Sequence, residues 1–87
     1  MKLKYTYEIM EIDDQLMAIP VGDSADETHS ILKLNESAAA ILSLLKDDLT
    51  EEEIIQKLLE DYDSSEEELR NSVYEYTKQL KEAGLVV

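Results

Sequence analysis

The stretch from Ile31 to Leu42 changes its hydrophobic period from that of a strand to that of a helix, without a glycine or proline at the boundary. Residues 31–34 form a short apolar run, whereas beyond Asn35 apolar residues recur at i, i+3, i+4 and i+7 and share one helical face. The side-chain oxygen of Asn35 can accept an otherwise free amide hydrogen bond of the first turn. We therefore predict a strand over about residues 30–34 that leads directly into a helix capped by Asn35.

Two more strands are expected before this point. Residues 5–12 are rich in aromatic and branched side chains, and Asp13-Asp14 then supplies turn residues. The next apolar run, residues 15–21, is expected to pair with the first as a hairpin. Residues 22–28 carry too little apolar surface to pack, so we expect an exposed loop there.

Two capping boxes indicate two further helices. In residues 50–53, and again in residues 65–68, a hydroxyl side chain is followed three positions later by a glutamate, so that each can satisfy a backbone donor of the other. The first of these helices is expected to end near Tyr62, and Gly84 supplies the left-handed residue that commonly closes the second. Residues 85–87 are then a short apolar tail, which we expect to pack against the core.

This order predicts an α+β fold, in which a three-stranded antiparallel sheet is followed by three amphipathic helices that cover one of its faces. The length of 87 residues suits a single domain over residues 1–87 with one core. The sequence has no cysteine, no long apolar run and no signal peptide, because its charged start is followed by tyrosines and acidic residues. We expect a soluble, cytoplasmic protein without a membrane partner.

The net charge of -13 comes from 21 acidic and 8 basic residues and repels phosphate groups, so nucleic acid is not expected as a partner. His29 is the only histidine, and without cysteine a metal site would need to be built almost entirely from carboxylates. The acidic triplets at 51–53 and 66–68 fall in first helical turns, where negative charge stabilises the helix dipole. We therefore expect no catalytic residue, no metal and no cofactor, and not an enzyme.

Four segments, in their order and spacing, resemble the PqqD family. They are LNESAA at residues 34–39, TEEEII at 50–55, LLEDY at 58–62 and LKEAGLV at 80–86. The resemblance covers about residues 28–87, and the hairpin before it fits by pattern. It implies a RiPP recognition element, a small winged helix-turn-helix-like domain.

Such a domain is a non-catalytic adaptor that binds the leader of a ribosomally made precursor peptide and presents it to a modifying enzyme. The resemblance implies that the leader adds a strand to the edge of the third strand and lies in a groove against the third helix. PqqD itself works with a radical SAM enzyme, so this resemblance favours a radical SAM protein as the partner. Related domains serve cyclodehydratases, dehydratases and lasso-peptide proteases.

The residues supply candidates for both walls of that groove. Strand addition uses unpaired backbone donors and acceptors at a sheet edge, and alternate side chains then point to opposite faces. An unoccupied edge also leaves a homodimer open. The candidate peptide-binding residues are Ser30, Ile31, Leu32, Lys33 and Leu34 on the strand, and Arg70, Val73, Tyr74, Tyr76, Thr77, Leu80 and Lys81 on the third helix.

Each helix candidate also has a structural interpretation. Val73, Tyr76 and Leu80 share a stripe with Leu69, and each of them taken alone is expected first as core, whereas Tyr74 stands off that stripe and is the better functional candidate. The basic residues among and beside the candidates are expected either to gather at the groove and attract an acidic leader residue or to pair with neighbouring glutamates. They are Lys33, Arg70, Lys78 and Lys81.

Two other classes of protein fit parts of the pattern. An acyl carrier protein is also small and acidic, and Asp63-Ser64-Ser65 before a helix resembles its phosphopantetheine serine, although carrier proteins are all-helical. A mass shift after treatment with a phosphopantetheinyl transferase and coenzyme A would identify that class.

A winged-helix module that binds DNA shares the topology, but its recognition helix needs more than the three basic residues found here. Salt-sensitive DNA binding would identify it.

Overall fold

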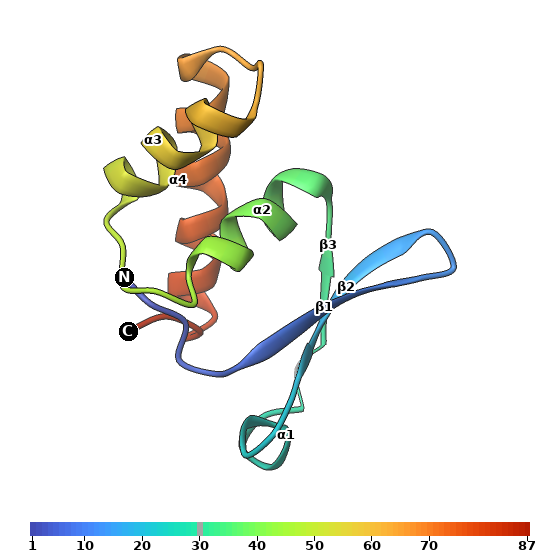
Figure 1. Cartoon of the computed structure of the whole chain (residues 1–87). Helices are drawn as coiled ribbons and strands as arrows, with labels where there is room; N and C mark the ends of the chain where they lie inside the picture. Colours follow the sequence, from blue (N-terminus) through green and yellow to red (C-terminus); the bar gives the residue numbers. More distant parts are fainter. Residues whose placement is uncertain (30) are drawn as a thin grey trace.

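The computed structural model describes residues 1–29 and 31–87, and its elements follow the predicted α+β order with one addition (Figure 1). A three-stranded antiparallel sheet and three long helices are present, and a one-turn helix lies between the second and third strands. The elements are β1 (Tyr7–Ile12), β2 (Gln15–Pro20), α1 (Ser24–Glu27), β3 (Leu32–Leu34), α2 (Glu36–Leu44), α3 (Glu51–Asp61) and α4 (Glu66–Glu82).

Helix α1 corrects the prediction of an exposed loop over residues 22–28. Ser24 is buried, and its Oγ accepts a hydrogen bond from the backbone N–H of Thr6 at 2.8 Å. This bond ties the segment to the residue that precedes β1. A single turn of four residues has no hydrophobic period to show in the sequence, and the contact that holds it is long-range.

The β1–β2 hairpin closes through the predicted Asp13-Asp14 turn. Both aspartates have positive φ, 51° and 64°, and they are flanked by the paired residues Ile12 and Gln15. A two-residue hairpin turn with both central residues in this region is of type I′, whose twist matches that of the strands. Figure 1 shows this hairpin extending beyond the helices.

The three long helices pack against one another, and α2 is the one that packs closely against β2 and β3, so the prediction that all three cover a face of the sheet holds mainly for α2. Leu85 is also buried and Val86 forms an antiparallel bridge with Leu3, so these two residues of the apolar tail pack as predicted, whereas Val87 is 74% exposed. No helix among residues 1–29 and 31–87 is long and apolar enough to cross a lipid bilayer. The largest fully buried side chains are Ile41, Leu45, Ile54, Val73 and Thr77.

The helix caps are formed largely as predicted. Asn35 Oδ1 accepts from the N–H of Ala38 at 2.8 Å. Thr50 and Glu53 form both bonds of the capping box, at 3.0 and 3.1 Å. At α4 the Ser65 half of the second box is present, because Ser65 Oγ accepts from the N–H of Glu68 at 3.2 Å.

Asn35→Ala is expected to lower the free energy of unfolding by about 1 kcal/mol, because the N–H of Ala38 loses its acceptor. Urea denaturation followed by circular dichroism measures this change. Asn35→Asp keeps a capping oxygen and is the matched control, with stability close to that of the parent. An alanine variant as stable as the parent would show that the cap contributes nothing at this boundary.

Candidate functional site

The hydrogen-bonding register of the sheet decides which backbone groups are open at its edges. The N–H of Val21 donates to the carbonyl oxygen of Thr6 at 3.0 Å, which makes these two residues a hydrogen-bonded pair. Hydrogen-bonded pairs alternate along an antiparallel ladder, so Met17 also turns its backbone groups toward β1. Leu16 and Ala18 therefore turn theirs toward β3.

On β3 this alternation leaves Lys33 facing outward. Leu34 pairs with Leu16 and Leu32 pairs with Ala18, so both leucines bond to β2. The N–H and C=O of Lys33 point away from β2, toward the edge of a sheet whose strand order is β1-β2-β3. β3 thus presents an open donor and acceptor at its centre.

The side chains of this strand alternate as predicted. Leu34 is buried and Leu32 is partly buried against the core, whereas Lys33 is exposed and Ile31 is 55% exposed. The leucines anchor the strand to the helices. The other two side chains lie on the outer face of the sheet.

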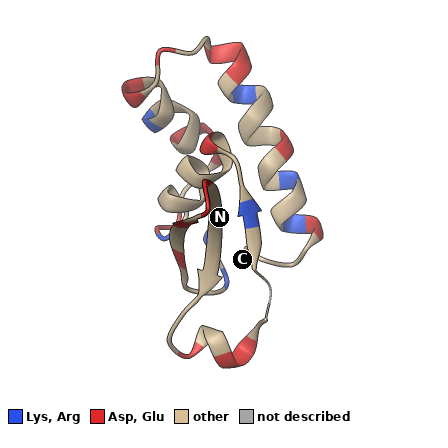
Figure 2. Ribbon diagram, turned by 90° about the vertical axis from the view of Figure 1, so that its right-hand side faces the viewer, with Lys and Arg blue, Asp and Glu red and all other residues tan. Residues whose placement is uncertain are grey.

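A groove of about 220 Å³ lies between α4 on one side and Lys33 of β3 with the first half of α2 on the other. Figure 2 shows the backbone of β3 and of α4, which both contribute residues to this groove. An extended peptide placed along β3 would therefore have α4 as its second wall. The groove is lined by Lys33, Asn35, Ser37, Ala38 and Ile41 on one side and by Ser72, Glu75, Tyr76 and Gln79 on α4.

Of the predicted α4 residues, the structure brings Tyr76 to this groove. Val73 and Leu80 are 0% and 3% exposed and belong to the core. Thr77 is fully buried, and its Oγ1 lies 2.8 Å from the carbonyl oxygen of Val73 and 3.1 Å from Glu51 Oε1 of α3. The expectation that these three side chains line the groove does not match their positions.

The predicted basic residues of α4 lie against α3. The Arg70 guanidinium donates two hydrogen bonds of 2.8 Å to the Glu52 carboxylate, and Lys81 Nζ lies 3.3 Å from Glu51 Oε1. The hydrogen bond from Arg70 lowers the pKa of Glu52. We expected the basic residues either to gather at the groove or to pair with glutamates. Arg70 and Lys81 pair with glutamates, and they do not gather with Lys33.

Two predicted site residues remain, Tyr74 and Ser30. Tyr74 is 61% exposed and does not line the groove, because two helical positions from Tyr76 correspond to about 200° around the axis. Ser30 lies outside the described residues.

Comparison with known proteins identifies the family. The profile of PqqD, coenzyme PQQ synthesis protein D, matches residues 25–86, which include β3 and the three long helices. The chain belongs to the PqqD family. The resemblance seen in the sequence is thereby confirmed. Among curated protein sequences, none matches this chain.

Two solved structures are similar to this PqqD-family chain over its whole length. TbiB1 in complex with the TbiA(beta) leader peptide has a TM-score of 0.67 and 19% identity, over 99% of this chain and 94% of that one. Lasso peptide synthetase B1 complexed with the leader peptide has a TM-score of 0.66 and 19% identity, over 99% and 95%. These similarities establish the fold, including the hairpin that precedes the family match.

Three α4 residues that line the groove of the PqqD-family chain were not predicted, Ser72, Glu75 and Gln79, and neither were Asn35, Ser37, Ala38 and Ile41 on its other wall. Ser72 and Gln79 lie at i−4 and i+3 from Tyr76, so Ser72, Tyr76 and Gln79 share one side of α4. The only signal in the sequence is the polar border of the apolar stripe, and because both borders are polar it does not select this one. Among the described residues, no group of His, Cys, Asp or Glu side chains could hold a metal ion.

Tyr76 is expected to titrate late. Burial, with a smaller contribution from Tyr7, raises the pKa of its phenol to about 12. Because an unfolded chain would lose this proton at the ordinary pKa of 10.0, folding stability should fall as pH rises from about 10 to 12. Tyrosinate absorbance measures the titration. Tyr76→Phe should remove a late step from the absorbance titration and lessen the fall in folding stability at high pH. An unchanged titration curve would contradict the burial of the Tyr76 hydroxyl.

Proposed function

We propose that this PqqD-family chain is a non-catalytic adaptor that captures the leader of a ribosomally synthesised precursor peptide and presents it to a modifying enzyme. The observation that carries the proposal is the open N–H and C=O of Lys33 beside the groove between β3 and α4. Strand addition takes affinity from such backbone groups and specificity from pockets for alternate side chains. The two solved structures of the same fold are both described as complexes with a leader peptide.

In this proposal the leader forms a fourth strand next to β3. Its central residue bonds to the backbone of Lys33, and side chains on one of its faces enter the groove toward Tyr76 and Gln79. The buried α4 residues and the Arg70 and Lys81 ion pairs hold α4 in place as the second wall. Leu32 and Leu34, on either side of the paired position, anchor the strand, and Ile31 lies on the outer face before them.

We further propose a radical SAM enzyme as the client and the cytoplasm as the site of action, because PqqD itself serves an enzyme of that class. The carrier-protein alternative draws less support. Ser65, the serine at issue, caps α4 through its Oγ, and three strands precede the helices.

Titration of isotope-labelled protein with the synthetic leader of the precursor encoded beside this chain tests the function. Amide shifts are expected at residues 31–34 and at Ser72, Tyr76 and Gln79. A scrambled leader of the same composition is the control and should leave these amides unmoved. Shifts confined to other parts of the chain would refute the site, and saturation behaviour identical for both peptides would refute specific recognition.

A further inference from the structure

A second cleft lies at the opposite edge of the sheet from the proposed leader site. Its volume is about 690 Å³, and it runs between the residues that lead into β1, the β1 edge and the end of α2. A cleft of this size falls in the range that accommodates a ligand of several side chains. It is lined by residues 2–9, Leu42, Ser43, Lys46 and Val87.

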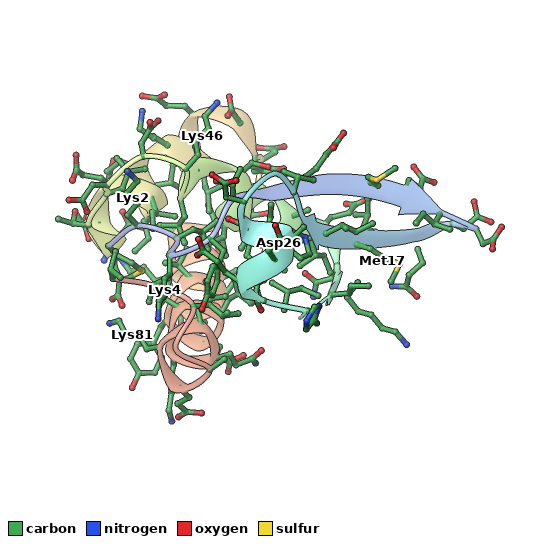
Figure 3. The ribbon with its side chains drawn as sticks, turned by 90° about the horizontal axis from the view of Figure 1, so that it is seen from below. Lys2, Lys4, Met17, Asp26, Lys46 and Lys81 are labelled. Atoms are coloured by element: carbon green, nitrogen blue, oxygen red, sulfur yellow. The ribbon has the colours of Figure 1, made fainter. Side chains whose placement is uncertain are left out.

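The lining of this cleft is rich in lysine, although the chain as a whole is strongly acidic. Three of the 8 basic residues, Lys2, Lys4 and Lys46, line it, opposed within the lining by Glu8 and the Val87 carboxylate. None of the three lysines forms an ion pair with a described residue, although Lys2 acts on Asp48 at longer range. Figure 3 shows them grouped away from the hairpin tip. Their charge is available to a partner.

The rest of the cleft is suited to an extended chain. Leu3, Tyr7 and Ile9 are partly buried against the core and supply apolar surface. The same alternation that opens Lys33 turns the backbone N–H and C=O of Tyr7 and Ile9 away from β2. The ammonium of Lys4 stands 5.5 Å from the centre of the Tyr5 ring, at the rim.

We propose that this cleft is a second docking site, which binds an extended segment of a partner protein with alternating acidic and apolar side chains. The segment bonds to the open backbone of Tyr7 and Ile9, places its apolar side chains on the cleft floor and turns its carboxylates to Lys2, Lys4 and Lys46. Because β1 and β3 are opposite edges of the sheet, a leader bound along β3 leaves the cleft free. The adaptor can then hold a precursor and a second protein at once.

A synthetic peptide of alternating glutamate and valine, without any leader present, tests this site by NMR titration. We expect shifts at residues 5–9 and at Lys46, and several-fold weaker binding when salt is raised from about 50 to 200 mM. An alternating lysine–valine peptide should leave the amides of residues 5–9 unmoved. No shift at residues 5–9, or shifts confined to the β3 groove, would overturn the proposal without bearing on the leader site.

Charge-reversal variants make the assignment specific. Lys4→Glu/Lys46→Glu is expected to weaken binding of the acidic peptide about tenfold, as two exposed charge contacts become repulsive. Lys57→Glu/Lys78→Glu changes the net charge equally but touches α3 and α4, and should change affinity less than about twofold. Equal effects of the two variants would attribute binding to net charge alone.

Two other results would overturn the proposal. Amide shifts at residues 5–9 on addition of the leader peptide would assign the cleft to the precursor, and shifts there that depend on protein concentration would assign it to a second copy of the chain.

Discussion

Lys33→Pro is expected to weaken leader-peptide binding by at least about tenfold while the sheet remains folded. The N–H of Lys33 points away from β2, so proline removes a donor that serves the incoming strand and not the existing ladder. A lost backbone hydrogen bond contributes about 1 kcal/mol, and the acceptor left unpaired on the peptide adds to this cost. Calorimetric titration with the leader measures the affinity, and circular dichroism verifies that the fold is retained.

Two further variants separate backbone from side-chain effects at this strand. Lys33→Ala keeps the N–H and should lose only the weak contribution of an exposed ammonium. Leu32→Pro removes a donor that faces β2, so it should destabilise the sheet itself. Unchanged affinity in a folded Lys33→Pro variant would contradict pairing at this residue.

The elements that could be predicted from the sequence are those specified locally. The Asn35 cap, the Thr50 capping box and the Asp13-Asp14 turn depend on side chains and backbone within a few residues, and all three form. The exposed and buried sides of β3 follow from simple alternation. The sequence does not show that the backbone of Lys33 faces an open edge, because this depends on the register of all three strands.

The helical wall of the site could not be predicted in the same way. The apolar stripe of α4 has polar residues on both borders, and the helix period does not say which border faces β3. The choice is made by α3, whose Glu51 and Glu52 pair with Lys81 and Arg70 from 30 and 18 residues away. With this border of α4 against α3, the opposite border, with Gln79, faces the groove.

The cleft at β1 also depends on long-range contacts. Lys2 and Lys4 are near one another in sequence, but Lys46 joins them only because the segment before β1 bonds to the end of α2. The N–H of Leu3 donates to the carbonyl oxygen of Leu45 at 3.0 Å. A basic cluster on a chain of net charge -13 is therefore a product of the fold.

Leu80→Ala is expected to lower the free energy of unfolding by about 2 to 4 kcal/mol, whereas Gln79→Ala should change it by less than about 0.5 kcal/mol. Leu80 is 3% exposed in the core, while Gln79 is exposed and lines the groove. Urea denaturation measures the stability of both variants, and titration with the leader measures their affinity.

These adjacent positions therefore distinguish the two interpretations of α4. If Leu80 acts as core, its alanine variant loses stability and, under conditions where it stays folded, keeps most of its affinity. If Gln79 is part of the peptide wall, its variant keeps stability and binds the leader more weakly. The reverse pattern, a stable Leu80→Ala variant with impaired binding, would mean that the apolar stripe itself meets the peptide, which would require α4 to turn away from α3 and break the Arg70–Glu52 pair.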